Sequence, residues 1–163
     1  MAALARSLRP AMRMLSSGRP VLTTKRGYAD GEMNFTFAAA NQVYYIGANV
    51  KQVDVPTFSG SFGILPNHVP VLAVLKPGVV TVYEQDGSKK EVFVSSGTVT
   101  INDDSSVQVL AEEACLVQEL DKSACQDVLS KAQSQLASAT TEVEKAEAAI
   151  AVEVGEELVR SAL

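Results

Sequence analysis

Hydrophobic and polar positions alternate with a period of two between residues 34 and 118, in short runs separated by turn residues. Such runs predict β-strands. The expected strands are 34–38, 42–46, 51–57, 70–75, 78–84, 89–95, 98–101, 106–110 and 114–118. The Asp86-Gly87 step between 78–84 and 89–95 favours a tight hairpin, because a glycine there accepts a positive φ angle. Short strands at this spacing, with no helix-length insert, predict an antiparallel β-sandwich of about nine to ten strands.

After Leu120 the pattern changes to Ala, Gln, Glu and Lys with helical spacing. Ser123 followed by Gln126, and Thr141 followed by Glu144, have the spacing of capping boxes and predict two helix starts. The expected apolar stripes are Val128, Leu129, Ala132 and Leu136 in the first helix, and Val143, Ala146, Ile150, Val154 and Leu158 in the second. Their short connection predicts an antiparallel α-helical hairpin. The fold class is therefore α+β, with a β-sandwich domain at 29–119 and a helical hairpin at 120–163.

The expected hairpin buries few large side chains, so its apolar contacts fall short of the backbone entropy lost on ordering it. It must dock on its own sandwich or on a partner. A coiled coil is the alternative, although the stripes are short and rich in Ala. Gly155 marks either a bend or a point of close packing in the second helix.

The first 28 residues hold six basic residues and no acid, with Ser, Thr, Ala, Leu and Met between them. This composition is typical of a mitochondrial transit peptide, with cleavage expected near Ala29. A disordered basic tail is the alternative.

Removing these six positive charges takes the formal net charge from −5 to about −11. A strongly acidic protein has no electrostatic drive toward nucleic acid or anionic lipid, so basic protein partners are favoured. No apolar run approaches the length needed to span a bilayer. Cys115 and Cys125 are expected to be free thiols in a reducing matrix.

Candidate chemistry concentrates in SGSFGILPNHVP, residues 59–70, which contains the chain's single histidine, His68. A metal site needs more ligands than this segment supplies. No nucleophile elbow or phosphate-binding loop follows from the sequence, and Asp103-Asp104 and Glu112-Glu113 come after turns, as solvated carboxylates do. We therefore predict no catalytic, cofactor or metal residue, and the segment is either a folding corner or a contact surface.

The segments GSFGILPNHVPVLAVLKPGVV, FVSSGTVTI and SSVQVLAEEA together resemble the ATP synthase family that comprises the mitochondrial delta and the bacterial and chloroplast epsilon subunits. The resemblance implies a non-catalytic rotor subunit of the central stalk of the mitochondrial proton-transporting ATP synthase. The implied partners are the gamma subunit, the small mitochondrial epsilon subunit and the membrane c-ring. The implied location is the matrix side of the mitochondrial inner membrane, and the implied role is to couple proton translocation to ATP synthesis.

The same resemblance implies a role for individual residues. The loop would face the c-ring, which makes Ser61, Phe62, Ile64 and His68 the expected contacts. Ser61 stands where bacterial relatives carry an acid. His68 either touches the ring or pins its own turn through a backbone hydrogen bond.

The resemblance also implies that a groove between the hairpin and the sandwich holds the small epsilon subunit, with Val128, Leu136, Ile150 and Leu158 as helix residues facing it. Several bacterial relatives bind ATP through a Leu/Ile-Asp-x-x-Arg-Ala pattern at the start of the first helix. Here Ala124 stands in place of the arginine, so nucleotide binding is not predicted. The competing function is a free-standing mitochondrial matrix module that binds a small ligand or a protein.

Overall fold

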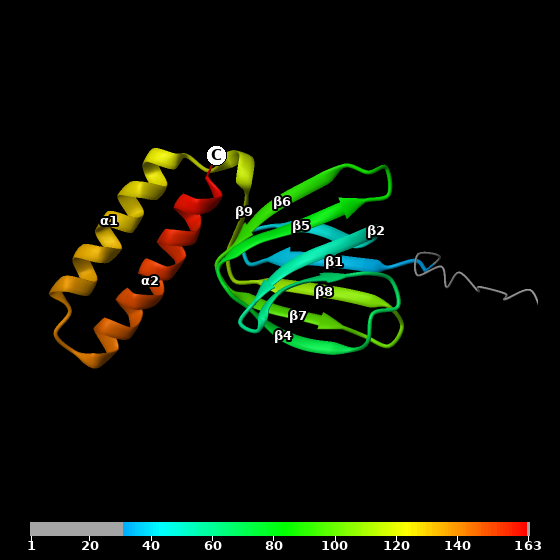
Figure 1. Ribbon diagram of the computed structural model, residues 1–163, viewed down its shortest axis with the longest axis horizontal. Coiled ribbons are helices and arrows are strands. Elements are labelled where there is room, and N and C mark those ends of the chain that lie inside the picture. Colours follow the sequence, from blue (N-terminus) through cyan, green and yellow to red (C-terminus); the bar gives the residue numbers. More distant parts are fainter. Residues whose placement is uncertain (1–30, 163) are drawn as a thin grey trace, which may run out of the picture.

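The computed structural model describes residues 31–162 and shows a β-sandwich followed by a helical hairpin (Figure 1), which confirms the predicted fold class. The expected transit segment, 1–28, lies outside the described residues. The strands are β1 (Asn34–Ala39), β2 (Val43–Thr57), β3 (Gly60–Ile64), β4 (Val71–Leu75), β5 (Gly78–Glu84), β6 (Lys89–Val94), β7 (Gly97–Ile101), β8 (Ser106–Ala111) and β9 (Ala114–Leu116). A short 3-10 helix, η1 (Val117–Glu119), leads to α1 (Lys122–Ser138) and α2 (Glu142–Ser161).

Strand β2 belongs to both layers of the sandwich. Its first half pairs with β1, and its second half pairs with β3 and β5. Gly47, with φ 57°, lies at an irregularity of the pairing with β1, between Tyr45 and Ala48, because a glycine accepts this backbone at little cost. The two strands expected at 42–46 and 51–57 are therefore one bent strand. It links a layer of β1, β8, β7 and β4 to a layer of β3, β5, β6 and β9.

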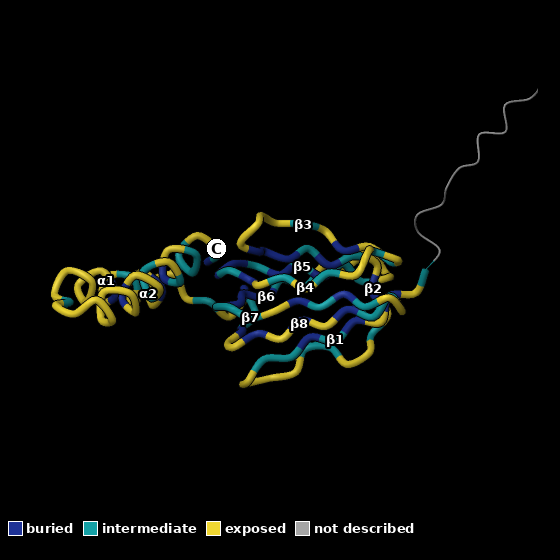
Figure 2. Tube along the Cα trace, turned by 90° about the horizontal axis from the view of Figure 1, so that it is seen from below, coloured by how far each residue is buried: buried dark blue, intermediate teal, exposed yellow. Residues whose placement is uncertain are grey.

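The core lies between the two layers and follows from the alternation of each strand. In β1, Phe35 and Phe37 are fully buried while Asn34 and Thr36 point outward. In β8, Val107 and Val109 are buried in the same way, between more exposed neighbours. Figure 2 shows this as alternating buried and exposed segments along the strands. The interior is apolar and continuous through the sandwich.

Two features of the sheet differ from the prediction. Strands β1 and β8 run parallel, whereas the other strand pairs of the described sandwich are antiparallel, as predicted. Periodicity within a strand carries no information on which distant strand lies beside it, so this pairing could not be predicted. Strand β3 was not expected, because Gly60, Ser61 and Gly63 have poor strand propensity. Pairing with β2 imposes the extended backbone there.

The β5–β6 hairpin is confirmed, with Gly87 at φ 88° and its N–H donating to the Glu84 carbonyl at 3.1 Å. Among the described residues of the turn, the positive φ belongs to Gly87 and not to Asp86. The Asp86 carboxylate instead accepts hydrogen bonds from the Ser88 hydroxyl and N–H, and these bonds lower the pKa of Asp86.

Of the two predicted N-terminal caps, the one of α2 is confirmed and the one of α1 is not. Thr141 and Glu144 form the expected capping box of α2, and hydrogen bonds from the Thr141 and Thr140 N–H groups lower the pKa of Glu144. The expected box at Ser123 is wrong. Asp121 is the N-cap of α1, and its carboxylate accepts the Ser123 N–H at 2.8 Å. Asp caps as well as Ser does, so the helix begins two residues earlier than predicted.

The two helices pack through their smallest side chains. The buried positions of the helices are Cys125, Ala132, Ala148 and Gly155. A Cβ added at Gly155 would lie 3.1 Å from the Cα of Leu129, so Gly155 marks close packing and not a bend. The expected stripe of α2 holds only in part: Ala148 and Gly155, which pack on α1, lie on another side of the helix, while Val154 and Leu158 of the stripe are partly buried. The larger side chains Val143 and Ile150 stay exposed, at 67% and 62%.

This packing predicts that Gly155→Leu destabilises the hairpin by about 1–3 kcal/mol, because the added side chain overpacks the contact with Leu129. Chemical denaturation followed by circular dichroism at 222 nm measures the change. Ala149→Leu, at an exposed position of the same helix, is the matched control and should leave stability almost unchanged. Equal stability of the two variants would contradict the packing.

Candidate functional site

The segment 65–70 lies at the end of the sandwich opposite the helices. Strands β7 and β8 pair from Gly97↔Ala111 at one end to Ile101↔Val107 at the other. Ser105, in the turn after β7, donates a hydrogen bond from its hydroxyl to Asn67 Oδ1 at 3.0 Å, so segment 65–70 lies at the Ile101 end. We call the surface formed by segment 65–70 and the turn 102–105 the loop end.

His68 is fixed within this loop by contacts of its backbone and its ring. Its N–H donates to the Leu65 carbonyl at 3.2 Å, and Nδ1 lies 2.8 Å from the Val69 carbonyl. Because a carbonyl only accepts, this bond places the proton on Nδ1 and leaves Nε2 free. The ring also stacks on Phe62, with 5.9 Å between centroids. The geometry supports the predicted pinning of the turn, and contact with a c-ring stays a prediction.

The other residues expected at this contact separate into two groups. Ser61 is exposed and Phe62 is half-buried, so both can reach a partner. Ile64 is wrong as a contact residue, because its side chain is fully buried in the core opposite Val53. Alternation along β3, which the sequence did not predict, turns Ile64 inward. Leu65 and Val69, exposed at 43% and 68%, offer the apolar surface in its place.

A second surface is the outer face of β4, β7, β8 and β1. Cross-strand neighbours form two rows on it, one of Leu72, Thr100, Gln108 and Thr36, the other of Val74, Thr98, Leu110 and Ala38. Both rows belong to the described part of the chain, and neither contains a charged side chain. Leu72, Val74 and Leu110 are exposed at 74%, 53% and 53%. We call these eight residues the uncharged face. Exposed apolar side chains gathered on one face are typical of a protein interface.

A third surface is a groove where α2 meets the sandwich. Phe93 points away from the core, because its neighbours Val92 and Val94 point into it, yet Phe93 is only 4% exposed. Helix α2 lies on the sandwich side of the hairpin (Figure 1). Val154 and Leu158 of α2 line the groove together with Phe93. The hairpin thus docks on its own sandwich, one of the two predicted possibilities.

The groove has a volume of about 550 Å³, an apolar floor and an acidic rim of Glu112 and Glu113. Burial and the nearby Glu119 carboxylate raise the pKa of the Cys115 thiol, which also lines it. Cys115 and Cys125 are free thiols, as predicted. Of the helix residues expected to face the groove, Leu158 lines it. Val128, Leu136 and Ile150 do not line it and are exposed elsewhere on the hairpin.

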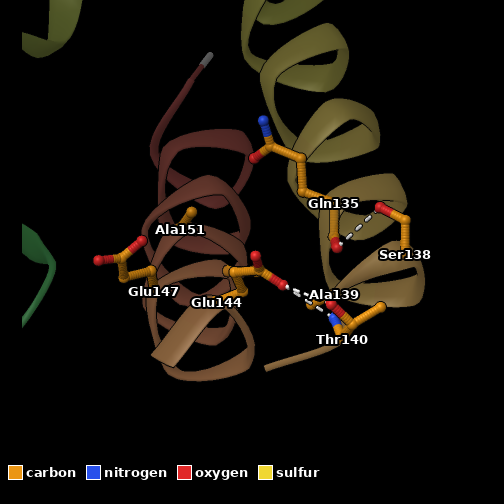
Figure 3. Close-up of a pocket in the computed structure, with 8 residues that line it drawn as sticks. Gln135, Ser138, Ala139, Thr140, Glu144, Glu147 and Ala151 are labelled. Atoms are coloured by element: carbon orange, nitrogen blue, oxygen red, sulfur yellow. Dashed lines mark hydrogen bonds between the residues drawn. The ribbon is translucent and has the colours of Figure 1, made fainter. Parts of the chain in front are cut away.

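A polar hollow of about 600 Å³ lies at the closed end of the hairpin (Figure 3). Gln135 approaches it from α1, and Glu144, Glu147 and Ala151 approach it from α2. The Glu144 carboxylate already accepts hydrogen bonds from the Thr140 N–H and hydroxyl, at 2.9 and 3.1 Å. The Glu144 carboxylate thus caps α2, and Glu147 is the other charged side chain among the described residues that line the hollow.

Across residues 31–162, no three His, Cys, Asp or Glu side chains gather as metal ligands would. None of the described helices combines the length and the apolar character of a membrane-spanning segment.

The groove predicts that Phe93→Ala weakens the attachment of α2 by about 3–5 kcal/mol, the usual cost of truncating a buried Phe. Hydrogen exchange should then accelerate in α1 and α2 more than in β7 and β8. Val92→Ala, which removes core volume from the same strand, is the control and should accelerate exchange throughout the sandwich. The same exchange pattern in both variants would contradict the docking of α2 on Phe93.

Comparison with known proteins identifies the family to which the chain belongs. Residues 32–117 match the model of the ATP synthase, Delta/Epsilon chain, beta-sandwich domain. The chain is 45% identical to ATP synthase subunit delta, mitochondrial, of Caenorhabditis elegans, over 86% of this chain and 91% of that one. It is 40% identical to the protein of the same name from Kluyveromyces lactis, over 91% and 94%.

Solved structures share the fold. One is a chain in the Euglena gracilis mitochondrial ATP synthase, OSCP/F1/c-ring in rotational state 1, with a TM-score of 0.73, 21% identity, and coverage of 98% and 99%. The family model and the two relatives confirm the family resemblance predicted from the sequence. The chain belongs to the ATP synthase delta/epsilon family, and its relatives are mitochondrial subunits named delta.

Proposed function

We propose that the chain is a non-catalytic subunit of the central stalk of mitochondrial ATP synthase, which joins the gamma subunit to the c-ring. The carrying observation is family membership over nearly the whole chain, at 45% identity to a mitochondrial delta subunit. The catalytic work belongs to other subunits of the complex. Homologues named mitochondrial support a mitochondrial location, and we extend the proposal to the matrix side of the inner membrane, where the expected transit peptide would deliver the chain.

The proposed mechanism is mechanical. Proton flow turns the c-ring, and a body held at two places transmits the rotation to the gamma subunit. The sandwich is suited to this because β2 links both layers and one apolar core fills the space between them. Close-packed interiors have low compressibility and transmit strain. No bond is made or broken in this chain.

The loop end is the proposed contact with the c-ring. His68 offers a free Nε2, and the His68 ring is held against Phe62 at 5.9 Å. Ser61 is exposed on β3 beside them. Leu65 and Val69 add apolar area. The contact therefore combines one hydrogen-bonding ring with an apolar surround, and it does not need the acid that bacterial relatives carry at the position of Ser61.

Replacing Phe62 and His68 together by Ala should lower ATP-driven proton pumping per ATP hydrolysed in membrane vesicles, because the rotor slips at the ring. ATP hydrolysis by the detached catalytic head should stay unchanged. A detached head that lost hydrolysis, or vesicles that pumped at the wild-type ratio, would refute the contact.

The uncharged face is the proposed contact with the gamma subunit. Its two rows present Leu72, Val74 and Leu110 among Thr and Gln side chains, which is the composition of an interface core without charges to desolvate. A stable attachment needs at least about 1,200 Å² of buried surface in total, and an exposed sheet face of four strands is the extended flat area that can supply a large part of it.

Leu72→Asp should weaken assembly with the gamma subunit by about 2 kcal/mol or more, since it buries an unpaired carboxylate at the interface centre. The fold should persist, because Leu72 is 74% exposed. Val143→Asp, at a 67% exposed position of α2, is the matched control. Affinity capture of the gamma subunit measures the effect, and equal capture by both variants would count against this face.

The groove between α2 and the sandwich is the proposed seat of the small mitochondrial epsilon subunit. Leu158 and Phe93 supply its apolar floor, and Glu112 and Glu113 supply an acidic rim that favours a basic segment. The exposed residues Val128, Leu136 and Ile150 would extend this contact along the hairpin. Phe93→Ala, which opens the groove, should therefore lose the small subunit during purification while the gamma subunit remains bound. Retention of the small subunit in this variant would place it elsewhere.

A further inference from the structure

Two residues at the loop end share an unusual backbone conformation. Within residues 31–162, Asn67 and Ser105 are the non-glycine residues with positive φ, at 60° and 64°. They stand 38 positions apart, and the Ser105 hydroxyl donates to Asn67 Oδ1 at 3.0 Å. The two non-glycine residues with a left-handed backbone in the described chain are thus hydrogen-bonded to one another.

Each of them forms a turn that other groups support. At Asn67, the His68 N–H closes the turn on the Leu65 carbonyl at 3.2 Å. At Ser105, the Ser105 N–H closes a turn on the Asn102 carbonyl, also at 3.2 Å. The Asp104 carboxylate then accepts the N–H and the hydroxyl of Ser106, at 2.9 and 2.6 Å.

The Asn67 amide is enclosed on its other side by Gly31. A Cβ placed at Gly31 would lie 2.5 Å from Asn67 Nδ2, so the amide lies directly against the backbone of the chain entering β1. The side chain of Asn67 therefore lies between Gly31 and Ser105. It joins three segments that are distant in the sequence.

Glycine adopts a left-handed backbone more easily than any other residue, and either turn would form with glycine alone. A side chain retained at such a position persists when surrounding contacts over-determine it, and such positions concentrate at functional sites. Here the side chains do something that glycine cannot do. They tie segment 65–70 to the turn between β7 and β8, which the core holds through Val99, Ile101 and Val107.

We propose that Asn67 and Ser105 are a positioning pair that holds His68 and Phe62 in place for the c-ring contact. This inference rests on the proposed function. Asn67 precedes His68 directly, so its backbone sets the direction in which the imidazole leaves the chain and stacks on Phe62. The hydrogen bond to Ser105 stops the loop from yielding under load, so force at His68 passes into β7 and β8 and not into a flexible loop.

The first experiment uses the tag-free protein, in which His68 is the single histidine and gives one imidazole Hε1 signal in NMR. Asn67→Gly keeps the left-handed backbone and removes the hydrogen bond, and Ser105→Gly does the same from the other side. Both should shift the Hε1 signal toward that of a free imidazole, because the ring leaves the face of Phe62. Asn67→Asp keeps an acceptor for the Ser105 hydroxyl and should restore the native shift. Asp103→Ala, in the same turn but outside the pair, is the control and should leave the signal in place.

The second experiment measures proton pumping per ATP hydrolysed in membrane vesicles that carry the same variants. Asn67→Gly and Ser105→Gly should each lower this ratio to near the level of the Phe62→Ala/His68→Ala variant, the double glycine variant should lower it no further, and Asn67→Asp should restore it. A native His68 signal in Asn67→Gly would overturn the positioning role. A lowered ratio in Phe62→Ala/His68→Ala with a normal ratio in Asn67→Gly would overturn its part in coupling. A normal ratio in Phe62→Ala/His68→Ala would instead overturn the ring contact itself.

Discussion

The strict alternation of side chains along the strands is the constraint on which the rest of the structure depends. Every strand of the two layers turns one set of side chains into a shared core, where Phe35, Val53 and Val109 are fully buried. Strand β2 passes through both layers, so the layers cannot slide without breaking its pairing with β1, β3 and β5. A one-residue slip would turn the core side chains outward. The result is a body whose two ends keep a fixed relation to each other.

Because the interior is filled, partners can be met only at the ends and the outer faces. The loop end gathers the single histidine with Phe62, Leu65 and Val69. The uncharged face mixes exposed apolar side chains with neutral polar ones, and the groove beside α2 is apolar with an acidic rim. These three chemistries suit three different partners, and they lie on one rigid scaffold. A rotor subunit that joins a ring to a shaft requires separate surfaces of this kind.

The parts of the fold that local chemistry decides were predicted from the sequence. The β5–β6 hairpin follows from Gly87, and the start of α2 follows from the Thr141–Glu144 pair. The parts that were missed depend on distant contacts. Strand β3 exists because β2 pairs with it, the same pairing buries Ile64, and the parallel pairing of β1 and β8 has no local signal. The buried side of α2 was missed because close helix packing selects Ala148 and Gly155 over larger residues.

The central claim is that this chain works as one part of a much larger rotary complex and not alone. Native gel electrophoresis of mitochondria solubilised in mild detergent, with detection of the endogenous chain, tests it most directly. The account predicts that the chain migrates with the ATP synthase, at a mass many times its own 17.3 kDa. Migration of the whole pool as a small free species would contradict the account and favour an independent matrix module.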